Sequence, residues 1–439
     1  MVNQLDDNPG LKNLLSGELS EEWRITTLGK IARIRRGASP RPIDSPQWFA
    51  DEGYGWVRIT DVTRSNGRLR YTEQYLSAKG ITQSVPVKPG QLIMSICATI
   101  GEPAIVEFNV CIHDGFVLFD EYDKNLDTNF LYYFLCYWKP NFRGYGQTGT
   151  QANLNTDIVA STPILLPPKE EQQQIAKILD TVDKAIAQTE TLIAKYKRVK
   201  TGLMQDLLTR GIDENGQLRD PKTHKFKRSP LGMIPDEWNV VILDTLCNKI
   251  TDGSHQSVKT SDHGVPFLYV SCIRDGKILW EETSRISEET YTLISKGREP
   301  LPGLILYTAV GSYGHAALVR NDKKFSFQRH IAYILPDAKK VNSEYLTFWL
   351  NTNQSKQYAD KVAIGNAQKT VTLGEIAKFP ILLPGIKEQN YIVEIITKID
   401  KYITYEETYK NKLKIQKAGL MQDLLTGKTS VKPLLTNHP

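Results

Sequence analysis

The sequence predicts an α+β protein in which two α/β domains form a pseudo-twofold repeat and are separated by two long coiled-coil helices. Three observations predict this fold: a length of 439 residues, an internal duplication, and helical apolar spacing in part of each copy. At about 150 residues per domain, the length suits three domains or two large ones. A composition that is 40% hydrophobic and 24% charged is ordinary for a globular protein. It excludes disordered, collagen-like and disulfide-stapled chains.

The duplication is clearest in residues 164–209 and 381–426, which are identical at about half of their positions. Residues 202–209 recur unchanged as 419–426 and read GLMQDLLT both times. Weaker matches upstream pair Trp23 with Trp238, Gly101 with Gly314, and His113 with His330. The whole half of the chain is therefore duplicated, in the order variable block, constant block, variable block, constant block.

The repeat also predicts the segment boundaries. We expect an N-terminal extension (1–20), a first variable domain (21–163), a first helical spacer (164–210), a linker (211–236), a second variable domain (237–380), a second helical spacer (381–427) and a tail (428–439). The variable domains contain β-type runs at 55–60, 91–96, 266–271 and 304–310, and each is expected to have one amphipathic helix, at 129–138 or 343–350.

In each constant block, apolar residues recur at alternating spacings of four and three, which is the a/d pattern of a coiled coil. Prolines precede each run, acidic residues occupy the first turn, and Gly211 and Gly427 follow the last apolar residues as helix stops. The expected coiled-coil and subunit-docking positions are Ile175, Leu179, Val182, Ile186, Leu203, Leu207, Ile392, Ile396, Ile399, Ile403, Leu420 and Leu424. A helix of about 40 residues spans about 60 Å. A purely structural rod and a rod that fixes the spacing of the two domains both remain open.

In the first variable domain, arginines are concentrated among aromatic and amide side chains. The second variable domain is less basic. Arginine contacts phosphates and guanine, and asparagine or glutamine pairs with adenine, so this mixture favours nucleic-acid binding. The expected DNA contacts are Arg35, Arg36, Arg41, Arg58, Gln147, Asn153, His255, Gln256, Lys259, Arg274, Asn366 and Lys369. The alternative is a solvated basic face, because a net charge of +6 permits DNA binding without requiring it.

The sequence contains no motif that supports catalysis. No Glu is followed two residues later by Lys, as in common metal-dependent nucleases, and no P-loop occurs. The run 144–149 fits G-x-G-x-x-G, but an aromatic helix precedes it, so it indicates a polar loop. The histidines and the five cysteines lack metal-ligand spacing, so no metal is expected. The odd number of cysteines, the polar first ten residues and the lack of an apolar run of about 18 residues predict a cytoplasmic protein.

Taken together, these features resemble one family, the specificity (S) subunits of type I restriction–modification systems. The resemblance spans residues 20–427. It rests on the helix starts at 167–172 and 384–389, GLMQDLLTRGI at 202–212, and HKFKRSPLGMIPDEW at 224–238. The Pro-Gly element of each variable block and TQANLN at 150–155 also fit.

The resemblance implies that 21–163 and 237–380 are target-recognition domains, each reading one half of a bipartite, asymmetric double-stranded DNA target in the major groove. It implies that the spacer helices pair antiparallel, set the spacer between the half-sites and dock two methyltransferase (M) subunits. Two restriction (R) subunits would complete the nuclease. The chain itself would be non-catalytic and without a cofactor, since S-adenosylmethionine, ATP and Mg²⁺ would bind the partner subunits.

Two other classes of function remain as alternatives. One is a coiled-coil scaffold or degenerate orphan subunit without sequence-specific DNA binding. Protection of two separated half-sites on DNA would argue against it. The other is a self-contained nuclease, which metal-dependent cleavage by the lone chain would reveal.

Overall fold

A computed structural model describes residues 21–144, 154–274, 276–366 and 368–435. The chain forms two compact units, unit 1 (1–190 and 408–439) and unit 2 (191–407). Each unit therefore combines one variable domain with half of each long helix. No helix within the described ranges is long and apolar enough to span a membrane.

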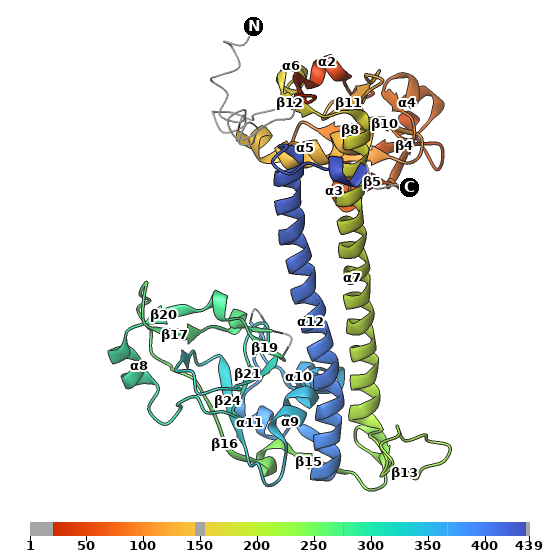
Figure 1. Ribbon diagram of the computed structural model, residues 1–439. Helices are drawn as coiled ribbons and strands as arrows, with labels where there is room; N and C mark the ends of the chain where they lie inside the picture. The colour runs from red at the N-terminus through yellow and green to blue at the C-terminus, as the bar shows by residue number, and fades with distance from the viewer. Residues whose placement is uncertain (1–20, 145–153, 275, 367, 436–439) are drawn as a thin grey trace. The chain divides into compact units, whose positions relative to one another are not determined.

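Two five-stranded sheets form the centre of the domain in unit 1, in the orders β2-β11-β8-β9-β5 and β3-β6-β4-β10-β7 (Figure 1). The first comprises β2 (Arg33–Arg36), β11 (Phe116–Asp120), β8 (Leu92–Ser95), β9 (Pro103–Val106) and β5 (Arg68–Leu69). The second comprises β3 (Phe49–Ala50), β6 (Gln74–Leu76), β4 (Tyr54–Val57), β10 (Val110–Ile112) and β7 (Val85–Val87). Alternate residues of β11 enter two different cores: Val117 and Phe119 enter one, and Phe116 and Leu118 the other. The first sheet is thus buried on both faces.

The long helix of this domain is α5 (Thr128–Gly144), which extends beyond the expected 129–138. Asp127 starts it, because Oδ1 accepts hydrogen bonds from the backbone N–H groups of Asn129 and Phe130, both at 2.9 Å. Its buried side chains include Phe130, Phe134 and Trp138, spaced by one turn. The remaining elements are α2 (Leu28–Ile31), η1 (Pro46–Trp48), α3 (Ile59–Arg64), α4 (Ala78–Thr82), α6 (Thr156–Ser161), α13 (Lys432–Leu435), and the antiparallel pair β1 (Arg24–Thr27) and β12 (Pro163–Leu166).

Unit 2 has a smaller version of the same architecture, with a four-stranded sheet β16-β24-β21-β22 and a three-stranded sheet β20-β17-β23. Their strands are β16 (Cys247–Asp252), β24 (Ile331–Pro336), β21 (Ile305–Thr308), β22 (Ala316–Leu318), β20 (Ser284–Ile286), β17 (Val265–Leu268) and β23 (Ser326–Phe327). Three two-stranded pairs add β13 (Phe226–Ser229) with β14 (Gly232–Pro235), β15 (Asn239–Ile242) with β25 (Pro380–Leu383), and β18 (Ile273–Arg274) with β19 (Lys277–Ile278). The helices are η2 (Leu243–Leu246), η3 (Val270–Cys272), η4 (Trp280–Glu282), α8 (Glu288–Ile294), α9 (Ser343–Leu350), α10 (Asn353–Val362) and α11 (Leu373–Ala377).

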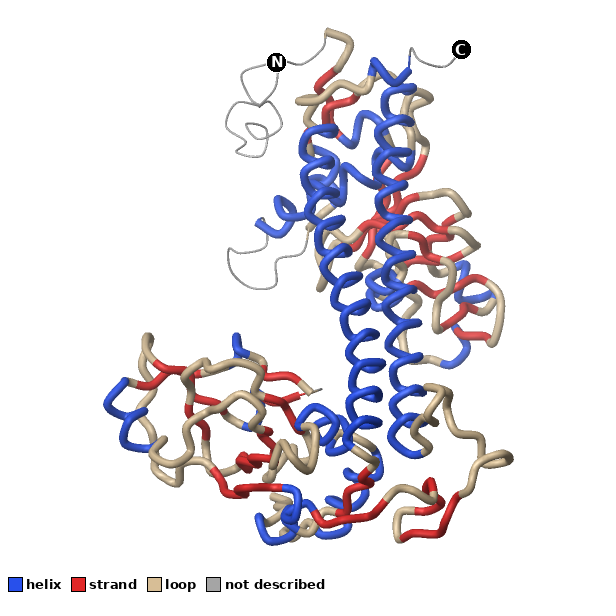
Figure 2. The backbone as a smooth tube through the Cα atoms, turned by 60° about the horizontal axis from the view of Figure 1, so that its bottom comes forward, coloured by secondary structure: helices blue, strands red, loops and turns tan. Residues whose placement is uncertain are grey.

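The two constant blocks form α7 (Lys169–Thr209) and α12 (Ile386–Leu425), which lie side by side in each unit (Figures 1 and 2). In unit 1, Lys417 pairs with Asp183 at 2.6 Å and Lys414 with Glu190 at 3.5 Å. In unit 2, Lys197 pairs with Glu407 at 2.7 Å and Lys200 with Asp400 at 2.6 Å. In both units the residue numbers rise along α7 as they fall along α12, so the helices run antiparallel.

The apolar seam of these helices continues into the domain cores at the helix ends. Ile175, Leu179 and Leu424 belong to the core of unit 1, and Leu207, Ile392 and Ile396 to that of unit 2. Ile403 is also buried, while Val182, Ile186, Leu203, Ile399 and Leu420 are half-buried. After the last turns, Gly211 and Gly427 adopt φ values of 62° and 73°, where glycine is favoured.

Matched hydrogen bonds give the register of the repeat inside the domains. Phe116 N–H bonds to the His113 carbonyl at 3.0 Å, and Ile331 N–H bonds to the Gln328 carbonyl at 3.1 Å. His113 therefore corresponds to Gln328, and His330 corresponds to Gly115. The sequence match of His113 with His330 was wrong, because the short insertions and deletions between the copies shift this turn by two residues.

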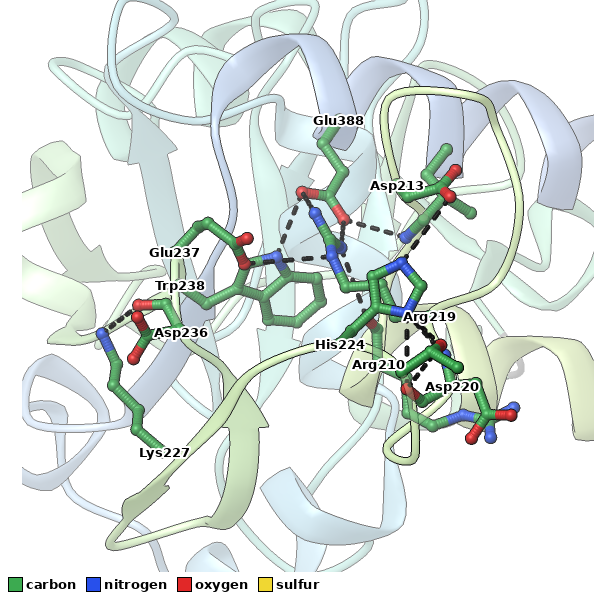
Figure 3. A network of polar contacts seen from close by, with 12 residues as sticks. Arg210, Asp213, Arg219, Asp220, His224, Lys227, Asp236, Glu237, Trp238 and Glu388 are labelled. Carbon is green, nitrogen blue, oxygen red and sulfur yellow. Dashed lines mark hydrogen bonds and ion pairs between the residues drawn. The ribbon is translucent and has the colours of Figure 1, made fainter.

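Each domain is joined to the long helix that follows it by a buried polar joint. In unit 1, Trp23 Nε1 donates to Glu171 Oε2 at 3.3 Å. In unit 2, Trp238 Nε1 donates to Glu388 Oε2 at 3.1 Å (Figure 3). The next residue is Gln172 in unit 1 and Gln389 in unit 2. Its side-chain oxygen accepts a backbone N–H hydrogen bond from the residue just before α5 or α9, and its side-chain nitrogen donates to the carbonyl of Pro167 or Pro384. This explains why the Glu-Gln pair recurs after each proline.

Candidate nucleic-acid interface

In unit 1, the segment that follows β2 is held against the turn between β10 and β11. Gly37 N–H bonds to the Phe116 carbonyl at 2.9 Å, and Ala38 N–H bonds to the Ile112 carbonyl at 3.1 Å. A Cβ at Gly37 would lie 2.1 Å from the His113 carbonyl oxygen, so only glycine permits this approach. The clamped segment and turn form the "turn edge" of unit 1, which we define as residues 36–41 and 112–116.

Charged groups gather on this turn edge around Asp114. Ser39 Oγ donates to Asp114 Oδ1 at 2.6 Å, and an Arg41 guanidinium nitrogen lies 3.5 Å from Asp114 Oδ2. Arg36 Nε donates to the Asp114 carbonyl at 2.8 Å. The hydrogen bond from Ser39 is the main cause that lowers the pKa of Asp114, and nearby His113 and Arg41 add to it. The Asp114 carboxylate is therefore paired with Arg41, while Arg36 binds the backbone carbonyl of the same residue.

Arg58 approaches the same turn from the end of β4. Its guanidinium carbon lies 5.8 Å from the Trp56 ring centre, and its Nε donates to Gln74 at 2.9 Å. His113 lies 5.8 Å from Trp56 and accepts the Gly115 N–H at Nδ1 at 2.9 Å. Burial lowers the pKa of His113, Asp114 partly opposes this, and Arg58 lowers it further. The imidazole is thus neutral near pH 7, and the exposed cations at this edge are arginines.

The other expected DNA contacts of the first domain lie elsewhere or outside the described ranges. Arg35 precedes Arg36 on β2 and so points to the opposite face, where it pairs with Asp120 at 3.1 Å. Arg35 is therefore separated from the turn edge. Gln147 and Asn153 lie outside the described residues.

The turn edge of unit 2 (252–256 and 327–331) has the same backbone frame. Gly253 N–H bonds to the Ile331 carbonyl at 3.2 Å, and Ser254 N–H bonds to the Phe327 carbonyl at 2.9 Å. Its side chains differ, because Arg329 occupies the place of Asp114. The carboxylate of this edge lies in the other segment, where Asp252 Oδ2 is 2.7 Å from His255 Nε2.

A hairpin-like loop lies next to this edge and contains two expected contacts, Asn366 and Lys369. The loop is closed by backbone bonds between Ile364 and Thr370, and the Lys369 carbonyl accepts Gly311 N–H at 2.9 Å. It is linked to the edge through Ala309, whose N–H donates to the His330 carbonyl at 2.9 Å. Asn366 and Lys369 are exposed, as are Gln256 and Lys259 on the segment after Ser254.

Burial lowers the pKa of His330, and the neighbouring Arg329 and His255 lower it further. His255, His330 and Arg329 therefore lie together. Arg274 lies on the two-stranded pair of β18 and β19, where it is opposite Lys277. Sequence reasoning did not single out Asp114, Ser39 or Asp252. The signal available for Asp114 was its place in the His-Asp-Gly turn, a sequence typical of tight turns. Among the described residues, no group of three or more His, Cys, Asp or Glu side chains is placed to hold a metal ion.

The two halves of the chain both match one family of known proteins. The family model described as the type I restriction modification DNA specificity domain matches residues 20–198 and again residues 235–415. The chain belongs to this specificity family. The two matches confirm both the expected family and the internal repeat.

Relatives of the specificity family cover the chain almost completely. The type I restriction enzyme MjaVIII specificity subunit of Methanocaldococcus jannaschii is 24% identical over 440 residues, covering 99% of each chain. The EcoBI specificity subunit of Escherichia coli is 25% identical over 429 residues, covering 94% of this chain and 86% of the relative. The crystal structure of a type I S subunit from M. genitalium has a TM-score of 0.55 at 12% identity, covering 93% of this chain and 98% of that chain. A chain from a structural study of type I complex assembly has a TM-score of 0.61 at 17% identity, covering 94% and 100%. The structural matches confirm the expected fold class.

Proposed function

We propose that this specificity-family chain is the non-catalytic DNA-reading subunit of a type I restriction–modification enzyme, acting in the cytoplasm. Each domain would read one half of a bipartite, asymmetric DNA target through its turn edge in the major groove. The observation that carries the proposal is one hydrogen-bonded frame with different side chains, Asp114 and Arg329 at the same place. A shared frame gives both domains the same approach to DNA, and different edge side chains give them different half-sites.

The helices would set the spacer and dock two M subunits, with two R subunits completing the nuclease. The identical runs 202–209 and 419–426 support this part of the proposal. In both runs the glycine (Gly202, Gly419) and the glutamine (Gln205, Gln422) are exposed, so packing within the chain does not require their identity. Two copies of one partner surface would require it. S-adenosylmethionine would then bind M, and ATP and Mg²⁺ the partner subunits, leaving this chain without a cofactor.

Methylation mapping tests the reading function directly. Cells expressing the chain with its M partner should carry methyladenine at a single motif of two half-sites separated by a fixed spacer. Arg41→Ala should relax one half-site, and Lys369→Ala the other. Methylation without any sequence preference would instead support the scaffold alternative, and methylation by the chain without M would overturn the non-catalytic assignment.

The ruler function needs a change that keeps the helix seam intact. We expect one extra heptad in α7 after Thr189, with a matching heptad in α12 beside Lys410, to lengthen the pair by about 10 Å. At 3.4 Å per base pair, the spacer should grow by about three base pairs while both half-sites stay the same. An unchanged spacer in an assembled, active complex would refute the ruler. A heptad in α7 alone is the control, because it breaks the pairing and should abolish assembly.

A further inference from the structure

Asp114 is an unexpected residue on a surface proposed to meet phosphates. Its side chain is 45% exposed, and its two carboxylate oxygens face the Ser39 hydroxyl at 2.6 Å and the Arg41 guanidinium at 3.5 Å. A hydroxyl and a guanidinium converging on an anion are also the groups that contact DNA phosphates. Asp114 therefore occupies the place that a phosphate oxygen would take beside Arg41.

The backbone fixes this arrangement. The two hydrogen bonds of the Gly37 clamp hold the segment bearing Ser39 and Arg41 against the turn bearing Asp114. Arg36 adds a third tie, since its Nε bonds to the Asp114 carbonyl and does not depend on the carboxylate. Loss of the Asp114 charge would therefore leave the turn in place and release Arg41, whose side chain is 70% exposed.

The second domain has no carboxylate at the position equivalent to Asp114. Arg329 replaces Asp114, so the tip of the turn is cationic instead of anionic. The carboxylate on the turn edge of unit 2 is Asp252, at the end of β16, and it pairs with His255. The two turn edges would thus attract DNA backbone to different extents, the first being partly neutralised by its own carboxylate.

We infer that Asp114 is an internal competitor of DNA phosphate, a positioning residue that restrains Arg41 and limits sequence-independent binding by the first domain. This inference rests on the proposed function. On target DNA we expect Arg41 to keep its ion pair with Asp114 and to face a base edge, so the pair lowers the affinity for target DNA little. On non-target DNA a phosphate can bind Arg41 only by breaking that ion pair, so the pair lowers the affinity for non-target DNA more than the affinity for target DNA. The residue would therefore raise discrimination without itself contacting a base.

The test is Asp114→Asn, which keeps the size of the side chain and an acceptor for Ser39 but removes the charge. In the assembled complex with M, we expect affinity for non-target DNA to rise about three- to tenfold at 0.15 M salt, with a steeper salt dependence by about one counterion. Target affinity should change less, so the ratio of target to non-target affinity should fall. Methylation mapping should show relaxation confined to the half-site that Arg41→Ala also affects.

Two controls separate this role from general charge and from folding. Glu121→Gln removes the same charge from the pair that Glu121 forms with Arg33 at the other end of β2, 2.7 Å apart, and should leave the ratio unchanged. In an Arg41→Ala background, Asp114→Asn should have no further effect, because the cation it restrains is gone. Ser39→Ala loosens the carboxylate without altering the charge and should produce a weaker form of the same change, which provides a second test if Asp114→Asn folds poorly.

An equal rise in affinity for non-target DNA in Glu121→Gln would overturn the inference. A rise caused by Asp114→Asn that persists without Arg41 would overturn it too. If wild-type complex prefers a bipartite target but Asp114→Asn leaves its discrimination unchanged, the inference alone fails. If wild-type complex shows no preference for any sequence, the proposed function fails and the inference with it.

Discussion

Glu171 and Glu388 occupy the same position in the first turns of α7 and α12, but their surroundings differ. In unit 2, Glu388 Oε1 accepts Arg219 at 2.5 Å and the Ile212 N–H at 2.9 Å, and Oε2 accepts Trp238 and Arg219 (Figure 3). In unit 1, Glu171 Oε2 accepts Trp23, while Oε1 is buried without a hydrogen-bond partner among the described residues. The same joint is fully satisfied in one unit and half satisfied in the other.

The difference traces to one cation in each unit. Arg219, in the linker, lies 3.9 Å from Glu237 and reaches Glu388 with two nitrogens. Lys432, in the C-terminal segment, pairs with Glu22 at 2.7 Å. Glu22 and Glu237 each precede the joint tryptophan, so Lys432 takes the place of Arg219. A guanidinium has several fixed donors and can serve two carboxylates, whereas an ammonium is a single compact charge. A duplicated joint can thus weaken by exchange of one cation while its tryptophan and glutamate remain.

The largest expected effect is the loss of the cation in unit 2. Arg219→Ala should leave Glu388, whose side chain is only 15% exposed, without its main charge partner, at a cost of about 3–5 kcal/mol in the free energy of unfolding of unit 2. Hydrogen exchange resolved by unit would measure it, because a two-unit chain need not unfold in one step. Arg228→Ala, on the exposed surface of β13, is the matched control and should change little. A loss below about 1 kcal/mol would show that the linker arginine is not what secures the joint.

One substitution made in both joints should have unequal effects. Trp238→Phe removes one donor from Glu388, which keeps Arg219 and the Ile212 N–H, and should cost about 1 kcal/mol beyond the loss of packing. Trp23→Phe removes the one donor that the described residues give to Glu171, which is buried, and should cost about 2 kcal/mol beyond packing. Chemical denaturation of each variant, with hydrogen exchange to assign the loss to a unit, measures the difference. Equal losses would mean that Glu171 obtains a further partner in solution.

The contrast between the joints also marks the limit of what the sequence could predict. The repeat, the α7 and α12 helices and the stops at Gly211 and Gly427 were predictable, because each depends on spacing or local conformation. The Glu-Gln pair was visible as a motif, but its role was not, since Trp23 and Glu171 meet across the whole first domain. Of the arginines expected to contact DNA, Arg36 and Arg41 bond to Asp114 and Arg58 lies near His113, whereas Arg35 faces away because adjacent strand residues point to opposite faces. A pattern of cations does not reveal which of them a carboxylate restrains.

A smaller effect should follow from giving unit 1 the cation of unit 2. Lys432 lies near enough to Glu171 for both carboxylates to raise its pKa, and the main cause is the hydrogen bond that Lys432 donates to Glu22. We expect Lys432→Arg to bond Glu22 and Glu171 together and to raise the melting temperature of unit 1 by about 1–2 °C. Lys428→Arg, which changes the exposed partner of Asp423, is the matched control and should have no effect. A lowered melting temperature would show that the site cannot accommodate the larger guanidinium group.

The smallest expected effect concerns pH and the turn edges, where His113 in unit 1 stands in the place of Gln328 in unit 2. Burial is the main cause that lowers the pKa of His113, so the unfolded chain takes up a proton more readily than the folded one. Its contribution to stability is therefore present above the unfolded value of about 6.5 and is lost as the pH falls below it. Protonation at Nδ1 would also break the bond from Gly115 N–H.

Unit 1 should accordingly lose stability between pH 7.5 and 5.5, and His113→Gln, which installs the residue of the second domain, should flatten that dependence. Thermal unfolding across this range, followed by unit-resolved hydrogen exchange, provides the measurement. The stability of unit 2 should keep its own dependence on pH in this variant, because the pKa of His330 is also lowered by burial and is untouched by the change. A slope in unit 1 that survives His113→Gln would assign the pH dependence to another group. If the pH dependence of unit 1 disappears, the acid sensitivity of this unit is assigned to one turn residue, His113, whose counterpart in unit 2 is Gln328.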